Sequence, residues 1–175
     1  MKKFIVPLVV LFIAGCAIFQ PANTSYRIRT TVDTSDGAIL NTLVNNLLNE
    51  KMMSNEMLFL NVQQRIKGID TTYFFIIDYT TTHHWFSSID RETLVLHVNG
   101  AHLEFSSDGK MNHRDVENQV HETSYYAVTL DQLYQIAHAT MVDVNLSTIQ
   151  YFEVRHFTGI NLSDLQHFLA EYAHR

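Results

Sequence analysis

The sequence is poor in the residue types that mark many catalytic and structural sites. Its 175 residues include one cysteine, two prolines and six glycines. A single cysteine excludes an intramolecular disulfide, so packing alone must stabilise the core. The few glycines form no phosphate-binding loop, and the chain has neither a nucleophile elbow nor the paired histidines of a zinc-protease helix. The sequence therefore carries no recognisable catalytic motif.

Positive charge is also scarce, and histidine is unusually common. The formal net charge is −6 when histidine is counted as neutral. This acidic balance argues against a nucleic-acid partner, because such binders need concentrated lysine and arginine. The ten histidines nearly equal the 12 lysines and arginines together. An unperturbed histidine titrates near pH ~6.5, so mild acid would reverse the sign of the net charge.

The first sixteen residues have the layout of a secretory signal. Lys2 and Lys3 form a basic head, and an apolar run from Phe4 to Ala14 follows. This run is shorter than the roughly 20 apolar residues of a transmembrane helix. Small residues then lead into Cys16, the only cysteine.

At Ile13-Ala14-Gly15-Cys16 the sequence resembles the lipobox of bacterial lipoproteins. The resemblance implies that residues 1–15 are a signal peptide, which signal peptidase II removes between Gly15 and Cys16. It further implies diacylglycerol on the sulfur of Cys16 and an acyl chain, such as palmitate, on its new amine, with no other cofactor. Ala17 stands where an aspartate would signal inner-membrane retention, which implies the periplasmic face of the outer membrane in a Gram-negative cell. The alternative is an ordinary cleaved signal that leaves a free cysteine.

The remaining chain is expected to be one tethered domain. Residues 16–24 contain the lipidated cysteine and a tether, whose eight residues after Cys16 span at most about 28 Å. Residues 25–175 suit a single domain. Their patterns predict the α+β class, with an antiparallel sheet of about six to eight strands and two or three covering helices, including a C-terminal helix.

Three helices are expected. The apolar spacing over 39–48 predicts an amphipathic helix, and a hairpin turning at Asp36-Gly37 is the alternative. Thr129 begins a capping box for a helix that ends near His138. Asn161 is expected to cap the final helix. The continuous apolar run over 73–77 predicts a central strand covered on both faces.

Asn99-Gly100 is the clearest turn signal, since alternating strands flank it. A two-residue type I′ turn there places His97 opposite His102, with Glu104 two residues further along. These three side chains can hold a divalent transition metal or share a proton. The alternative is an exposed histidine pair without a function.

The polar segment 107–121 lacks periodicity and predicts a long loop, either disordered or contacting an envelope partner. The expected function is a lipid-anchored envelope protein with a non-catalytic binding or structural role. A metal- or pH-responsive histidine-rich binding protein is the alternative. A hydrolase comes third, because Ser, His and Asp can meet in the fold without leaving a local motif.

Overall fold

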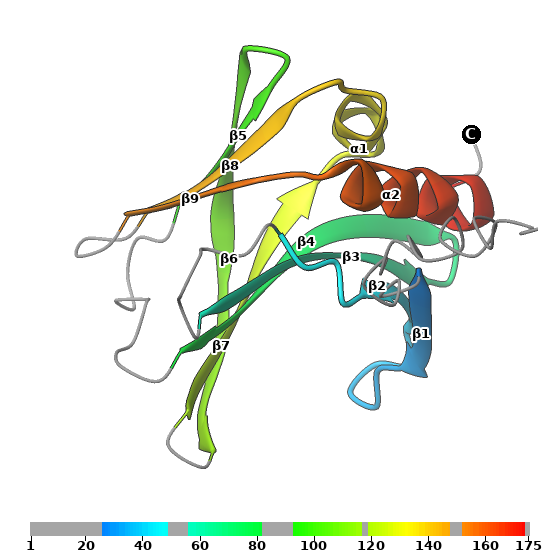
Figure 1. Ribbon diagram of the computed structural model, residues 1–175. Helices are drawn as coiled ribbons and strands as arrows, with labels where there is room; N and C mark the ends of the chain where they lie inside the picture. Colours follow the sequence, from blue (N-terminus) through cyan, green and yellow to red (C-terminus); the bar gives the residue numbers. More distant parts are fainter. Residues whose placement is uncertain (1–25, 49–55, 82–92, 117–118, 148–151, 174–175) are drawn as a thin grey trace, which may run out of the picture.

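A computed structural model describes residues 26–48, 56–81, 93–116, 119–147 and 152–173. These residues form one nine-stranded antiparallel sheet and two helices, α1 (Leu130–Ala137) and α2 (Gly159–Tyr172) (Figure 1). The strands are β1 (Arg27–Val32), β2 (Ile39–Val44), β3 (Met57–Lys67), β4 (Asp70–Thr81), β5 (Thr93–Val98), β6 (Ala101–Val116), β7 (Gln119–Val128), β8 (Val142–Ser147) and β9 (Phe152–His156). The antiparallel sheet and the C-terminal helix are confirmed, while the expected six to eight strands were too few.

The strand order is β1-β2-β3-β4-β7-β6-β5-β8-β9. Most neighbours in the sheet are also consecutive in the chain, so they pair as hairpins. The exceptions are β4 with β7 and β5 with β8. These two pairings join three locally paired units into one sheet.

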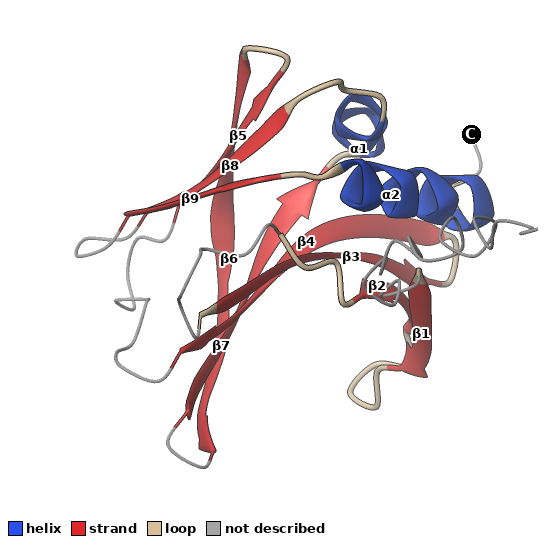
Figure 2. Cartoon of the chain, viewed as in Figure 1, coloured by secondary structure: helices blue, strands red, loops and turns tan. Residues whose placement is uncertain are grey.

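Both helices lie on the same face of the sheet, where the hydrophobic core is located (Figure 2). Leu133 and Ile136 of α1 and Phe168 of α2 are fully buried against apolar side chains of the strands. Phe75 of β4 meets Phe105 of β6 edge to face, with 5.4 Å between the ring centroids. No described helix is long and apolar enough to cross a membrane.

The segment predicted as a helix over 39–48 begins as strand β2. Val32 pairs with Ile39 around the turn containing Gly37, whose φ is +74°. The hairpin alternative is therefore confirmed, and the helix prediction was wrong. Asn45 has a φ of 64°, which ends the regular strand, and Leu47 then forms a bridge to Phe59. Pairing with β3 outweighs the helical spacing of the apolar residues.

The segment 107–121 is not the expected loop. Strand β6 continues to Val116, β7 begins at Gln119, and these two residues are paired. The two strands form a long hairpin (Figure 1), and on its other edge β7 pairs with β4 as far as Val120, opposite Thr81. Glu122 and Ser124 of β7 lie on the core side and are buried although they are polar, so this part of the sheet lacks the apolar alternation that marks a half-buried strand.

The other expectations concern the caps of the two helices and the position of β4. The cap of α2 is Thr158, and Asn161 is the third helical residue of its capping box. For α1, the predicted capping box of Thr129 with Gln132 is confirmed. Strand β4 lies between β3 and β7 in the middle of the sheet, as predicted, and the two helices cover one face of its apolar run. Ile76 points away from the helices yet is only 5% exposed, which indicates that neighbouring side chains shield it.

Candidate binding face of the sheet

The sheet face opposite α1 and α2 is called here the uncovered face. Side chains alternate along each strand, so Leu60 and Val62 of β3 point into the core, while Asn61 and Gln63 point to the uncovered face. No described helix or strand packs over this face (Figure 1). It carries two groups of polar side chains, a groove on one half and a row of histidines on the other.

The groove has a volume of about 310 Å³ and crosses strands β1, β2, β3, β4 and β7. It is lined by Arg29, Thr31, Thr42, Val44, Asn61, Gln63, Ile76, Asp78, Thr123 and Tyr125. The two most buried of these are Asn61 and Ile76, which are 4% and 5% exposed. Such a volume is at the lower end of the range for small-molecule sites.

Asp78 is held in place at the β7 side of the groove. Its Oδ2 accepts a hydrogen bond of 2.6 Å from Asn61 Nδ2, and its Oδ1 accepts one of 2.7 Å from Thr123 Oγ1. A carboxylate has about four acceptor positions, so these two bonds leave acceptor capacity for a ligand. Across the groove, Gln63 Nε2 donates to Thr42 Oγ1 at 3.0 Å, which leaves the amide oxygen of Gln63 as an acceptor.

Arg29 supplies the positive charge at the opposite side of the groove, on edge strand β1. Its side chain is exposed and has no hydrogen bond or ion pair within the described part of the chain. Arg65, by contrast, is paired with Asp36 outside the groove. The groove therefore combines a fixed carboxylate with a guanidinium whose five donors are open to a ligand.

A chain of buried amides connects the groove to α2 through the sheet. Asn161 Nδ2 donates to Asn46 Oδ1 at 2.7 Å and to the carbonyl of Leu47 at 2.8 Å. The backbone N–H of Asn46 donates to Asn61 Oδ1 at 3.1 Å, and Asn61 in turn donates to Asp78. Because both ends of the Asn61 amide are used, its orientation is fixed. A satisfied buried network of this kind holds a binding site rigid before a ligand arrives.

The other half of the uncovered face carries a continuous cross-strand row. His102 of β6 pairs with His97 of β5, His97 pairs with Asp143 of β8, and Asp143 pairs with His156 of β9. The predicted pairing of His97 with His102 is confirmed, and their ring centroids lie 5.3 Å apart. Asp143 and His156 contact each other directly, with 2.5 Å between Oδ1 and Nδ1.

Glu104, the third predicted metal ligand, lies beside His102 at 3.8 Å between Oε2 and Nε2. No three His, Cys, Asp or Glu side chains in the described ranges lie close enough together to hold a metal ion. The metal site at His97, His102 and Glu104 therefore stays a prediction. The position of Asp143 in this row was not predicted, because no local turn signal marks the pairing of β5 with β8.

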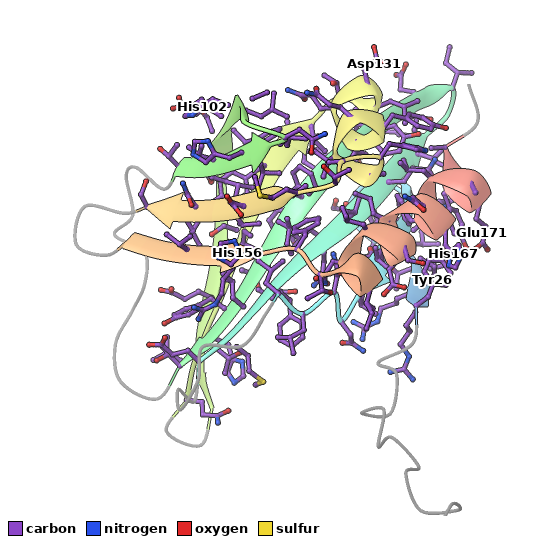
Figure 3. All side chains as sticks on the ribbon, turned by 45° about the horizontal axis from the view of Figure 1, so that its top comes forward. Tyr26, His102, Asp131, His156, His167 and Glu171 are labelled. Atoms are coloured by element: carbon purple, nitrogen blue, oxygen red, sulfur yellow. The ribbon has the colours of Figure 1, made fainter. Side chains whose placement is uncertain are left out.

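A third polar cluster joins the start of β1 to the last turns of α2 (Figure 3). Tyr26 donates a hydrogen bond of 2.8 Å to Glu171 Oε2, and its ring meets His167 edge to face at 5.5 Å. Burial and the neighbouring carboxylate raise the pKa of Tyr26 above its usual range. Burial likewise raises the pKa of Asp164 on α2. This cluster holds Tyr26, the first described residue, against α2.

A larger hollow of about 600 Å³ lies at the other end of β4 and β7, next to Tyr172. It has no charged side chain in its lining, so the smaller groove offers the richer chemistry despite its size. Asp143 and His156 form a carboxylate–imidazole pair of the kind that hydrolases use, but neither residue lines this hollow or the groove. The predicted cleavage site, Gly15-Cys16, lies outside the described residues.

No family model matches the sequence, and neither the curated proteins nor the solved structures include a significant match.

Proposed function

We propose that this protein is a lipid-anchored component of a bacterial cell envelope, whose domain binds another envelope component and has no catalytic role. The observation that carries the binding role is the uncovered face. It presents a preformed polar groove with fixed side chains, while the opposite face is used for the core. The lipobox at Ile13–Cys16 supports the proposed location in the cell envelope. Diacylglycerol together with an N-acyl chain exceeds the two signals that stable anchoring requires.

The anchor is tested by changing Cys16 to Ser in the host cell. The variant should leave the membrane fraction, because the sulfur that accepts diacylglycerol is lost. Continued co-sedimentation of the Ser variant with membranes would contradict lipid anchoring. A Ser25→Ala variant serves as a matched control for a single substitution upstream of β1, and it should stay with the membranes.

The binding role is tested by cross-linking the protein in its own membranes, followed by purification in mild detergent and mass spectrometry. Cross-links should form between an envelope component and residues of the uncovered face. Cross-links that map only to α1 and α2 would place the binding surface elsewhere and contradict the proposal.

Metal binding at the histidine row is a second candidate function. The observation favouring it is that three imidazoles and one carboxylate share one register row on an uncovered face. Imidazole suits zinc, copper and nickel, and a site with two or three protein ligands completes its coordination with water.

Zinc titration of the purified protein at pH 7.5 tests this candidate. Binding should be lost when His97 and His102 are both changed to Ala, and it should weaken as the pH falls, because protonated imidazoles cannot ligate metal. His138→Ala is the matched control, since His138 is an exposed histidine on a separate element. Equal zinc binding by the wild type and the His97/His102 double variant would show that the histidine row is not a metal site.

A further inference from the structure

The two charged side chains of the groove, Arg29 and Asp78, lie three strands apart on the uncovered face. Arg29 pairs with Thr42 in the sheet, Thr42 pairs with Gln63, and Gln63 pairs with Phe74, four residues before Asp78 on the same strand. Strands lie about 4.8 Å apart and rise about 3.3 Å per residue, so the Cα atoms of Arg29 and Asp78 are separated by up to about 19 Å. The two side chains cover part of this distance, so a ligand that contacts both residues can be up to about 10 Å long.

The hydrogen-bonding groups of the groove are mostly neutral and of both kinds. Threonine hydroxyls donate and accept, the Gln63 amide oxygen accepts, Asp78 accepts and Arg29 donates. Val44 supplies an apolar surface and Tyr125 an aromatic ring, while Ile76, which is 5% exposed, lies at the base of the groove. The groove thus offers both hydrogen-bonding groups and apolar contact area.

This combination excludes several classes of extended ligand. A nucleic acid or another polyanion would meet one arginine and a fixed carboxylate, which is unfavourable without further cations. An extended peptide is usually bound through its main chain at a sheet edge, whereas this groove lies on a sheet face and offers only side chains. A lipid tail would take water away from the remaining acceptor positions of Asp78 and from the Arg29 guanidinium without replacing its hydrogen bonds.

An oligosaccharide satisfies all of these conditions. Each sugar ring carries hydroxyls that both donate and accept, and its C–H face packs against apolar and aromatic side chains. Two or three linked rings also span the distance between the two charged ends. We propose that the groove is a saccharide-binding site for a glycan segment of two or three sugar units. The inference rests on the proposed function, since it names the chemical class of the envelope component that the uncovered face binds.

Within this site, Asp78 accepts hydrogen bonds from adjacent hydroxyls of one ring, and Arg29 donates to oxygens of a ring at the other end. The amide chain from Asn161 through Asn46 to Asn61 holds the carboxylate in position. Preorganisation of this kind reduces the entropy lost on binding.

The test is saturation-transfer NMR and calorimetric titration of the full chain in lauryldimethylamine oxide, a detergent without a sugar headgroup. The probes are chitotriose, cellotriose and maltotriose, with trialanine as the peptide control. At least one trisaccharide should bind saturably, and trialanine should not. If no trisaccharide binds, or if trialanine binds in their place, the proposal is overturned.

The matched variants are Arg29→Ala and Arg27→Ala. Both arginines are exposed on β1 two residues apart, so they point to the same face, but only Arg29 lines the groove. Arg29→Ala should weaken saccharide binding about tenfold, since it removes a charged donor, and Arg27→Ala should leave binding unchanged. If both variants weakened saccharide binding equally, the effect of Arg29 would be explained by surface charge alone, and the assignment would be overturned.

Asp78→Asn tests the opposite end of the groove and should also weaken binding about tenfold, with circular dichroism confirming the fold. Unchanged affinity in this variant would overturn the role of the groove. Failure of the saccharide titrations can be distinguished from failure of the proposed function. Even if no saccharide binds, Cys16→Ser could still leave the membrane, and the uncovered face could still cross-link to a protein.

Discussion

Replacing Asn161 by Ala should destabilise the protein strongly, although the residue lies in the first turn of a helix. Its side chain is 3% exposed and donates to two acceptors, Asn46 Oδ1 and the Leu47 carbonyl. A buried acceptor left without its donor costs about 1–3 kcal/mol. The lost half of the capping box, where Asn161 accepts from the Thr158 N–H at 2.7 Å, adds about 0.5–1 kcal/mol. Because the Leu47 carbonyl is only partly buried, we expect about 3 kcal/mol in total.

Asn161→Asp separates the two roles of the side chain. Aspartate keeps the acceptor that completes the cap and is favourable near a helix N-terminus. It cannot donate to Asn46 when ionised, so the variant should be destabilised at pH 7 despite its good cap. Burial raises the pKa of the new carboxyl in the folded state. Its destabilisation relative to the wild type is therefore smallest below the unfolded pKa, at about pH 4, where the protonated group can donate again, and it becomes complete as the pH rises above the raised pKa of the folded state.

Urea unfolding followed by far-ultraviolet circular dichroism measures both variants. Asn145→Ala is the control, because Asn145 lies on the uncovered face and makes no side-chain hydrogen bond in the described part of the chain. That variant should change the free energy of unfolding by less than about 0.5 kcal/mol. If Asn161→Ala were equally mild, the amide chain would not be a cooperative network, and the argument for a rigid groove would fail.

Two further predictions concern turns. Gly100→Ala should lower the free energy of unfolding by about 1 kcal/mol or more, measured by thermal or urea unfolding, because its φ of +85° disfavours any side chain. Gly159→Ala at the start of α2 is the control and should be neutral or stabilising. Equal effects of the two substitutions would contradict the backbone argument. Lys67, a backbone N–H and Arg65 lower the pKa of Asp36, so this carboxylate contributes stability above its unfolded pKa that is lost as the pH falls through the folded pKa. The unfolding midpoint of Asp36→Asn should therefore lie below that of the wild type at pH 7, and the gap should close below about pH 4; a gap independent of pH would refute the ion-pair explanation.

Local signals predicted the parts of this fold that depend on neighbours in the chain. Asn99 and Gly100 adopt the positive φ values, 50° and 85°, that a type I′ turn requires, and the pairing of His97 with His102 follows from that turn. The capping box at Thr129 could be predicted for the same reason, since every group that it needs lies within four residues.

The errors arose where tertiary context outweighed a local pattern. Apolar residues over 39–48 have helical spacing, but the positive φ of Asn45 lets Leu43 and Leu48 both become buried in a broken strand. The polar part of the β6–β7 hairpin gave no strand signal, because residues that point to the core side there, such as Glu122 and Ser124, are buried but polar. The groove could not be predicted either, since Arg29 and Asp78 lie three strands apart and only the complete sheet order brings them to one face.

The two non-local pairings of the sheet have a kinetic consequence. Thr80 and His121 meet across β4 and β7 although 41 residues separate them, and closing a flexible segment of that length costs roughly 3 kcal/mol of entropy beyond a constant. The β5–β6 hairpin has a two-residue turn, so its closure costs far less entropy. We therefore expect the hairpins to form early and the joining of β4 to β7 and of β5 to β8 to limit the folding rate. Until these two pairings are complete, the long unpaired edges of β4, β5 and β7 are exposed to pairing with other chains, so this is the period when the protein is most prone to aggregate.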